Sequence, residues 1–188
     1  MTGFASELDL IDRTRVRIKD LETDAHVLLV SVLETGDAVE TVRETMGIEL
    51  PGEAGQVNEN APGYAFWLSP RSWLLRMSQA GAETALDAAR TGLPDYSIHA
   101  TPYSDALAWF EISGPGAGAL LARGGFLTLS ADGFQTGHFK RTVLADVSLL
   151  IWRRDAETWE VACERSRTKY FRDWLESSIA IQAEGATS

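Results

Sequence analysis

The sequence predicts an α+β domain made of two interlocked βαββα repeats related by a pseudo-twofold axis, with helices covering antiparallel-rich sheets. The first observation is that the same order of strand-like and helix-like segments occurs twice along the 188 residues. The second is that tryptophans bracket one hairpin turn in each repeat: Trp67 and Trp73, then Trp152 and Trp159. Each repeat is too short to bury both faces of its sheet, so we expect the two to share one core.

The domain boundaries follow from the two repeats. Residues 1–23 are charged and precede the first apolar run, so they are predicted to form an N-terminal extension. Residues 24–180 are predicted to form a single domain, with repeat halves at about 24–92 and 105–180. Residues 181–188 are predicted to be a frayed tail.

The first repeat opens with a strand at residues 26–33, which are apolar and rich in valine. Asp37 stands three residues before Glu40, the spacing of a capping box at the start of a helix, and Gly47 can end that helix. Residues 51–63 hold prolines, glycines and asparagines, so they predict a long loop.

Two strands joined by a tight turn, and then a helix, complete the first repeat, at residues 64–68, 73–77 and 82–90. The second repeat follows the same order. Its segments are a strand at 106–112, a helix at 115–123, a long connection at 127–139, a short strand at 143–146, strands at 148–153 and 158–163, and a helix at 166–179.

Charge and cysteine content exclude several classes of function. Lys and Arg number 17 against 27 Asp and Glu, giving a net charge of −10, so nucleic acid and anionic membranes are poor partners for this chain. We find no signal-peptide-like run and no apolar stretch long enough to span a membrane, and we therefore expect a soluble cytoplasmic protein. The single cysteine, Cys163, excludes an internal disulfide and is expected to be a buried apolar side chain in a strand.

A glycine-dense turn, Ser113 to Gly118, lies between a predicted strand and a predicted helix, where phosphate-binding loops occur. Ala119 stands where the third glycine of a dinucleotide fingerprint belongs, and Asp132 lies in a turn rather than at a strand end. We favour a packing turn, in which Ser113 caps the helix, Pro115 occupies its first turn and the glycines allow close approach to the sheet.

Catalytic and metal-binding patterns are not found in the sequence. The three histidines, His26, His99 and His138, have no metal-ligand spacing, and no serine has the surroundings of a catalytic nucleophile. We therefore assign no catalytic, cofactor-binding or metal-binding residue. Tryptophan and arginine are concentrated at the centres of contact surfaces, and His138 lies in a polar segment with two cations. On this ground the candidate partner-contact residues are His138, Trp152, Arg153 and Arg154.

The order and spacing of these segments resemble the folate-binding aminomethyltransferase superfamily, which includes the glycine-cleavage T-protein. Residues 108–124 (AWFEISGPGAGALLARG) resemble its strand–Gly-Pro-x-Ala–helix segment, and residues 66–75 (FWLSPRSWLL) resemble its first hairpin. Residues 141–153 and 164–175 are closest to one branch, the gamma subunit of heterotetrameric sarcosine oxidase. The resemblance covers residues 24–179, nearly the whole chain.

This resemblance implies an aminomethyltransferase folate-binding-domain-like fold and a non-catalytic subunit that serves assembly. The complex of such a chain with alpha, beta and delta subunits oxidatively demethylates sarcosine to glycine. It passes the one-carbon unit to tetrahydrofolate and forms hydrogen peroxide. FAD, FMN, NAD and zinc belong to the partner chains, and the gamma chain carries no cofactor of its own.

Two alternatives remain open. The chain could be the equivalent subunit of N-methylglutamate dehydrogenase, whose assembly is similar. It could also be a stand-alone folate-binding or aminomethyltransferase-like protein, which needs a carboxylate in a central cavity to hold the pterin. Asp105, Asp132 and Asp146 are the candidates for that carboxylate.

Overall fold

The computed structural model describes residues 16–21, 26–34, 36–61, 63–93, 97–125 and 133–185. The helices in these ranges are α1 (Ala38–Met46), α2 (Gln79–Gly92), α3 (Ala117–Ala122) and α4 (Thr168–Gly185), with single 3₁₀ turns at Ser104–Ala106 and Arg165–Arg167. The strands are β1 (Arg17–Asp20), β2 (His26–Val32), β3 (Val57–Asn60), β4 (Gly63–Ser69), β5 (Ser72–Met77), β6 (Ile98–Pro102), β7 (Leu107–Ser113), β8 (Phe139–Leu144), β9 (Val147–Arg153) and β10 (Thr158–Glu164).

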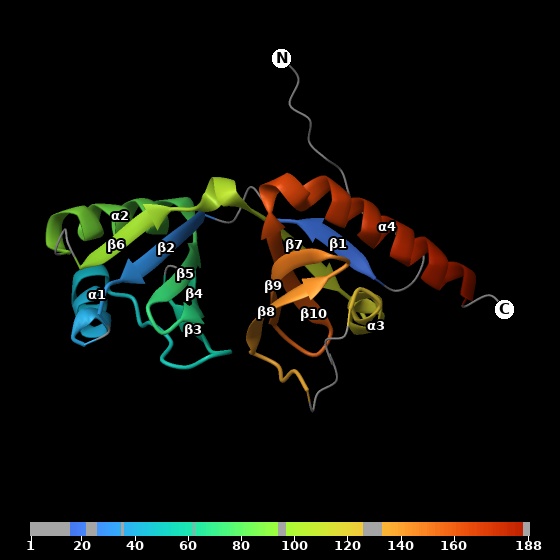
Figure 1. The fold of residues 1–188 in the computed structure, drawn as a ribbon, viewed down its shortest axis with the longest axis horizontal. Coiled ribbons are helices and arrows are strands. Elements are labelled where there is room, and N and C mark those ends of the chain that lie inside the picture. Colours follow the sequence, from blue (N-terminus) through green and yellow to red (C-terminus); the bar gives the residue numbers. More distant parts are fainter. Residues whose placement is uncertain are drawn as a thin grey trace, which may run out of the picture.

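The strands form two five-stranded antiparallel sheets, which confirms the predicted α+β class. We call them sheet A, with the order β1-β7-β10-β9-β8, and sheet B, with the order β3-β4-β5-β2-β6. In Figure 1 the sheets stand side by side, α1 and α2 lie beyond sheet B, and α3 and α4 lie beyond sheet A. The molecule therefore has four layers, helices outside and sheets inside.

Three apolar clusters hold these layers together. One joins sheet A to α3 and α4 and includes Phe110 and Phe171. A second joins sheet B to α1 and α2 and includes Trp73. The third lies between the sheets, where Phe66 of sheet B contacts Trp109 of sheet A at a ring-centroid distance of 5.8 Å. Because side chains alternate along each strand, every central strand supplies two of these clusters. The two halves therefore share an inter-sheet core, as expected.

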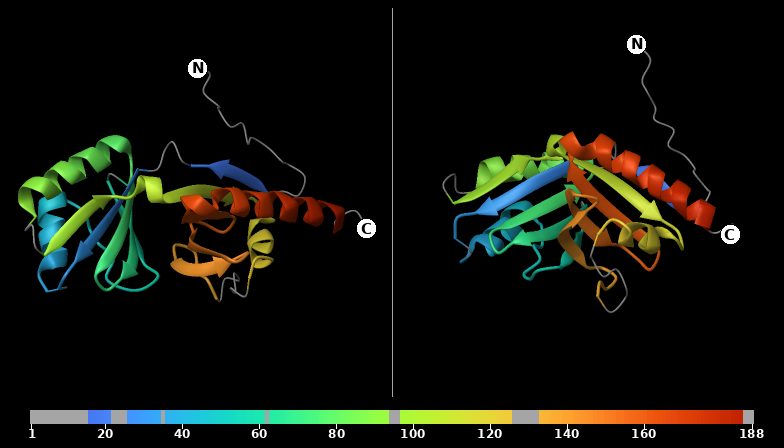
Figure 2. Two further views of the ribbon diagram at one scale, coloured as in Figure 1. Left: turned by 45° about the horizontal axis from the view of Figure 1, so that its top comes forward. Right: turned by 45° about the vertical axis from the view of Figure 1, so that its right-hand side comes forward.

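Exchange of edge strands interlocks the halves. β1 precedes the first half in the chain but pairs with β7 of the second, with Ile18 opposite Ile112. β6 precedes the second half but pairs with β2 of the first, with Ala100 opposite Val30. Figures 1 and 2 show the blue β1 beside the yellow-green β7. The pseudo-twofold relation between the halves stays a prediction.

The exchange places residues 16–21, which are part of the predicted N-terminal extension 1–23, within the fold. Val16 and Leu21, which flank β1, are buried, with 2% and 8% of their surface exposed. The short segment Arg-Ile-Lys-Asp has no apolar run, because as an edge strand it buries little and is held by backbone pairing to β7.

Three further boundaries differ from the expectation. β3 lies inside the predicted loop 51–63, and the Oδ1 atom of Asn60 accepts a hydrogen bond from the backbone of Glu49 at 2.8 Å. β8 begins at Phe139, four residues before the predicted strand 143–146. α4 continues past residue 179 through residues 181–185, which were expected to be frayed. β3 and β8 are both at sheet edges, where polar side chains are common, so apolar periodicity does not reveal them in the sequence.

The tryptophans of the two hairpins are equivalent only in part. Trp67 lies opposite Trp73 on β4 and β5, whereas Trp159 lies opposite Arg153 on β10 and β9. Trp152 is therefore one residue out of register, and it packs between the sheets while Trp67 packs toward the helices. From the sequence, Trp67 was expected to correspond to Trp152, and Trp73 to Trp159. The strand pairings show that the first correspondence is wrong by one residue, whereas the second is consistent with them.

Candidate functional site between the two sheets

A charged group is buried between the sheets. Glu160 on β10 has no exposed surface, although it lies within the apolar run from Trp159 to Cys163. Its neighbours Trp159 and Val161 point into the cluster under α3 and α4. Strand alternation therefore directs Glu160 to the opposite face of the sheet, toward sheet B. An unpaired carboxylate in such a place costs several kcal/mol, so it requires a cation.

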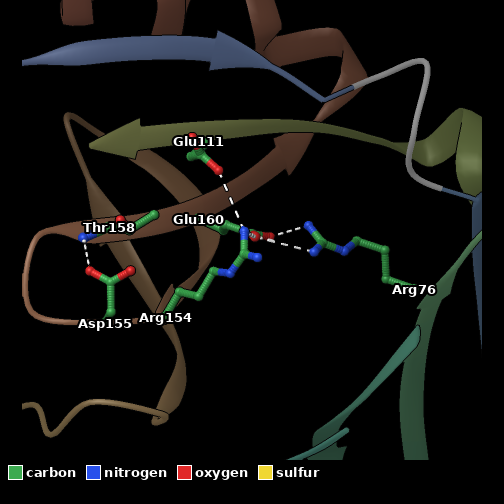
Figure 3. A network of polar contacts seen from close by, with 6 residues as sticks. All are labelled: Arg76, Glu111, Arg154, Asp155, Thr158 and Glu160. Atoms are coloured by element: carbon green, nitrogen blue, oxygen red, sulfur yellow. Dashed lines mark hydrogen bonds and ion pairs between the residues drawn. The ribbon is translucent and has the colours of Figure 1, made fainter. Parts of the chain in front are cut away.

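Two arginines supply that positive charge (Figure 3). Arg76 on β5 donates from both terminal nitrogens to the two Glu160 oxygens, and its Nη2–Oε1 distance is 3.2 Å. Arg154, the residue directly after β9, donates from Nη1 to Glu160 at 3.3 Å and to Glu111 at 3.5 Å. The Arg76–Glu160 pair links two residues 84 positions apart in the chain, and it joins the two sheets directly.

Aromatic rings surround the Arg76 guanidinium. Its central carbon lies 5.0 Å from the ring centroid of Trp109, 5.6 Å from that of Tyr64 and 5.9 Å from that of Trp152. The Arg76 side chain is only 12% exposed. Partial desolvation strengthens the attraction between a cation and the ring faces. We call Tyr64, Trp109, Trp152 and Glu160 the arginine cage.

Two cavities lie along the same inter-sheet space. One, of about 250 Å³, is lined by Tyr64, Arg76, Glu111, Arg154 and Glu160 among others. The other, of about 560 Å³, is mainly apolar, with leucines from both sheets and the charged residues Arg141 and Glu164 at its walls. The second has the size of a small-molecule pocket.

The predicted contact residues occupy different surroundings. Trp152 is buried in the arginine cage, and Arg154 belongs to the Glu160 network. Arg153 points the other way, lying 5.1 Å from the Trp159 ring and donating to the Phe134 carbonyl at 2.8 Å.

His138 is the remaining predicted contact residue. It is exposed and lines a separate cavity of about 270 Å³ beside Trp67 and Arg141. The structure therefore does not bring the four candidates together. Their role in partner contact stays a prediction.

The glycine turn has the geometry of a packing element. The Gly114 N–H, at a positive φ of 109°, donates to the Glu157 carbonyl at 3.0 Å, so it is already used within the fold. A Cβ on Gly118 would lie 3.9 Å from the Trp159 ring, an ordinary contact distance. The helix begins later than expected: Gly116 is its N-cap without a side-chain bond, so Ser113 does not cap it and Pro115 precedes it.

Two of the three carboxylates considered for pterin binding are described, and neither lines the inter-sheet cavities. Asp105 and Asp146 are exposed and line neither cavity, and Asp132 lies outside the described residues. The buried carboxylate is Glu160, which was not among the residues predicted from the sequence. One signal could have found it, namely a single charge within the apolar run Trp-Glu-Val-Ala-Cys.

The last features considered are the Cys163 thiol and the possible metal ligands among the described residues. Burial raises the pKa of the Cys163 thiol to about 11, so the thiol stays protonated at neutral pH. In the described ranges no three histidine, cysteine or carboxylate side chains gather as metal ligands. The helices of those same ranges are all too short or too polar to cross a bilayer.

Comparison with known proteins gives consistent relatives. A family model, "Sarcosine oxidase, gamma subunit family", matches residues 34–181. Sarcosine oxidase subunits gamma from an Arthrobacter species and from Corynebacterium sp. strain P-1 are 30% and 29% identical over 69% and 70% of this chain. The matched region covers 64% of each relative, just under two thirds of their length.

Solved structures show the same fold. A chain of the heterotetrameric sarcosine oxidase from Corynebacterium sp. U-96 superposes with a TM-score of 0.80 at 19% identity, covering 93% of this chain and 89% of that one. Aminomethyltransferase T of the Bartonella henselae glycine cleavage system gives 0.62 at 15% identity, covering 87% of this chain and 46% of that one. Since the family model spans most of the sequence, the chain belongs to the sarcosine oxidase gamma subunit family.

Proposed function

We propose that this chain is the gamma subunit of a heterotetrameric sarcosine oxidase and that it serves the assembly and stability of the complex. The complex would oxidatively demethylate sarcosine to glycine, pass the one-carbon unit to tetrahydrofolate and form hydrogen peroxide. Its alpha, beta and delta subunits would carry FAD, FMN, NAD and zinc. Membership of the gamma subunit family is the observation that carries this proposal.

The chemistry of the interior supports a non-catalytic role. Glu160 is bonded by Arg76 and Arg154, so its charge is neutralised by the protein itself. The Cys163 thiol is buried and protonated at neutral pH. A general base or a nucleophile needs a reactive group that a substrate can reach. Cys163 is covered and protonated, and the Glu160 carboxylate is already occupied by two arginines, so neither is available for such a role.

Three observations on the described residues support cofactor binding by the partner chains. Zinc needs a cluster of nitrogen, sulfur or oxygen ligands, and the described ranges hold no group of three. The Gly114 N–H, which a phosphate would need, is bonded to Glu157. The exposed Asp105 and Asp146 do not point to a pterin site. These observations favour cofactor binding by the partner chains.

Affinity purification of the tagged chain from its native host tests the proposal. We expect flavin-containing partner chains to co-elute and the eluate to oxidise sarcosine with formation of hydrogen peroxide. Expression of the partner chains without this one should give unassembled or unstable subunits. A tagged chain that elutes as a monomer, while its partners assemble and turn over sarcosine without it, would contradict the proposed role.

Two further assays separate the alternatives. Turnover of N-methylglutamate in preference to sarcosine by the purified complex would assign the chain to the dehydrogenase instead. Calorimetry of the isolated chain with tetrahydrofolate tests the stand-alone folate-binding protein. We expect no heat of binding, because the buried carboxylate is already paired with arginine.

A further inference from the structure

Arg76 belongs to the first half of the chain, but its side chain is bound mainly by residues of the second half. Its backbone belongs to β5 of sheet B, whereas Trp109, Trp152 and Glu160 are on β7, β9 and β10 of sheet A. Among the four cage residues only Tyr64, which lies on β4 opposite Arg76 of β5, comes from sheet B. Three of the four members of the arginine cage therefore belong to the second half.

The cage matches the chemistry of a planar cation. A carboxylate with two accepting oxygens pairs with the parallel N–H groups of a guanidinium or amidinium fork. Ring faces at 5.0–5.9 Å attract a delocalised, weakly hydrated positive charge. A point-like ammonium ion satisfies neither feature as well, because it is more strongly hydrated and has no planar fork.

Glu160 depends mainly on this cation. Arg154 also binds Glu160, but only at one of its oxygens, and the Arg154 side chain is 44% exposed. Arg154 is in addition shared with Glu111. Arg76 binds both oxygens and is nearly buried. Loss of Arg76 would therefore leave a buried carboxylate largely uncompensated.

We propose that the inter-sheet space contains a preformed binding site for a guanidinium or amidinium cation and that Arg76 is its resident ligand. In the resting chain Arg76 closes the site and joins the two halves. This inference concerns the isolated chain and does not rest on the proposed assembly. The neighbouring cavity of about 250 Å³, lined by Tyr64, Arg76 and Glu160, gives a small cation a route to the cage.

Replacement of the resident ligand by a soluble one tests the proposal. In the full chain, Arg76→Ala should lower Tm by about 6–20 °C, the loss typical of a broken buried ion pair in a domain of this size. Methylguanidinium chloride at about 10 mM, too dilute to denature, should restore several degrees of that loss by binding the folded state. Methylammonium chloride at the same concentration matches the charge and ionic strength and should restore little.

Three matched chains control this experiment. The wild-type chain should not gain stability, because Arg76 fills the site. Arg76→Ala combined with Glu160→Gln should not respond, because the accepting carboxylate is gone. Arg90→Ala removes an exposed arginine that pairs with Asp87 on α2, so it should neither lower Tm appreciably nor respond to methylguanidinium.

Several outcomes overturn the proposal. The first is that methylguanidinium does not raise the Tm of Arg76→Ala. The second is that methylammonium raises that Tm equally. The third is that methylguanidinium raises the Tm of the double variant as much as that of the single variant. If Arg76→Ala yields no folded chain, Arg76→Lys and Arg76→Met decide. If the site requires a cation, Arg76→Lys should have a higher Tm than Arg76→Met. A Tm of Arg76→Met equal to or above that of Arg76→Lys would refute the proposal.

Discussion

At the residue scale, Cys163 shows how burial sets reactivity. The thiol is 1% exposed on β10 beneath α4, and burial raises its pKa to about 11. We predict that iodoacetamide does not label the native chain at pH 8, as read by mass spectrometry, because the thiolate is scarce and covered. Labelling should become complete in urea. Rapid labelling of the native chain would contradict this account.

The same shift has a consequence for stability at alkaline pH. The folded-state pKa lies above the value of 9.0 expected for the unfolded chain, so the folded state holds the proton more tightly. The contribution of Cys163 to stability is therefore fully present below pH 9 and is lost as the pH rises toward 11. Cys163→Ala should lose less stability than the wild-type chain over that interval, as measured by urea unfolding at each pH.

At the element scale, the segment from Ser113 to Gly118, which leads into α3, contains two glycines that can be compared. Gly114 has a φ of 109°, which only glycine adopts freely, so Gly114→Ala should destabilise the chain by about 1 kcal/mol or more. Gly118 lies within α3, and its new Cβ would contact Trp159 at 3.9 Å. Gly118→Ala should therefore be neutral or stabilising by up to about 1 kcal/mol. Urea unfolding measures both, and equal destabilisation would disagree with a packing role for the turn.

The exchanged strand β1 makes a second prediction at this scale. Leu21 is buried in the inter-sheet cluster directly after β1, so Leu21→Ala should cost about 2–5 kcal/mol. Arg17→Ala, on the same segment but exposed, should change stability by about 0.5 kcal/mol or less. The comparison requires only thermal melts. A Leu21→Ala chain as stable as Arg17→Ala would mean that β1 does not anchor the halves.

At the scale of the whole molecule, strand exchange makes the two halves interdependent. A break between residues 95 and 96 separates β1 from β7 and β6 from β2. It also exposes the inter-sheet cluster, which includes Phe66 and Trp109. We predict that fragments 1–95 and 96–188 do not unfold cooperatively alone and form a 1:1 complex with a melting transition when mixed. Cooperative unfolding of either fragment alone, followed by circular dichroism, would contradict this prediction.

Elements with strong local patterns were predictable from the sequence. The hairpin of β4 and β5, the strand β2 and the helix α1 agree with their expected positions to within one or two residues, although Asp37 at the N-cap of α1 makes no side-chain cap bond, so the predicted capping box is wrong. Each is marked by apolar periodicity and by turn or cap residues next to it. Polar strands such as β3 were not predictable, since its Val-Asn-Glu-Asn sequence is typical of a loop and its pairing with β4 makes it a strand.

The candidate site was only partly predictable for the same reason. The sequence singled out Trp152 and Arg154 as unusual, and both do lie at the Glu160 network, while Arg153 between them faces the opposite side of the sheet. Glu160 and Arg76 are 84 residues apart, and no local pattern relates them. Their pairing follows from the way the two sheets face each other.

By itself, the sequence determined the α+β class and the family to which the chain belongs, because these depend on local periodicity and on motif order along the chain. The predicted βαββα order was incomplete, since each half has a further edge strand, β3 or β8, between its first helix and its hairpin. The tertiary structure decided which edge strands are exchanged, which face of β9 carries Trp152, and which cation neutralises Glu160. These features depend on backbone pairing and desolvation between distant segments, and such interactions exist only once both halves are packed.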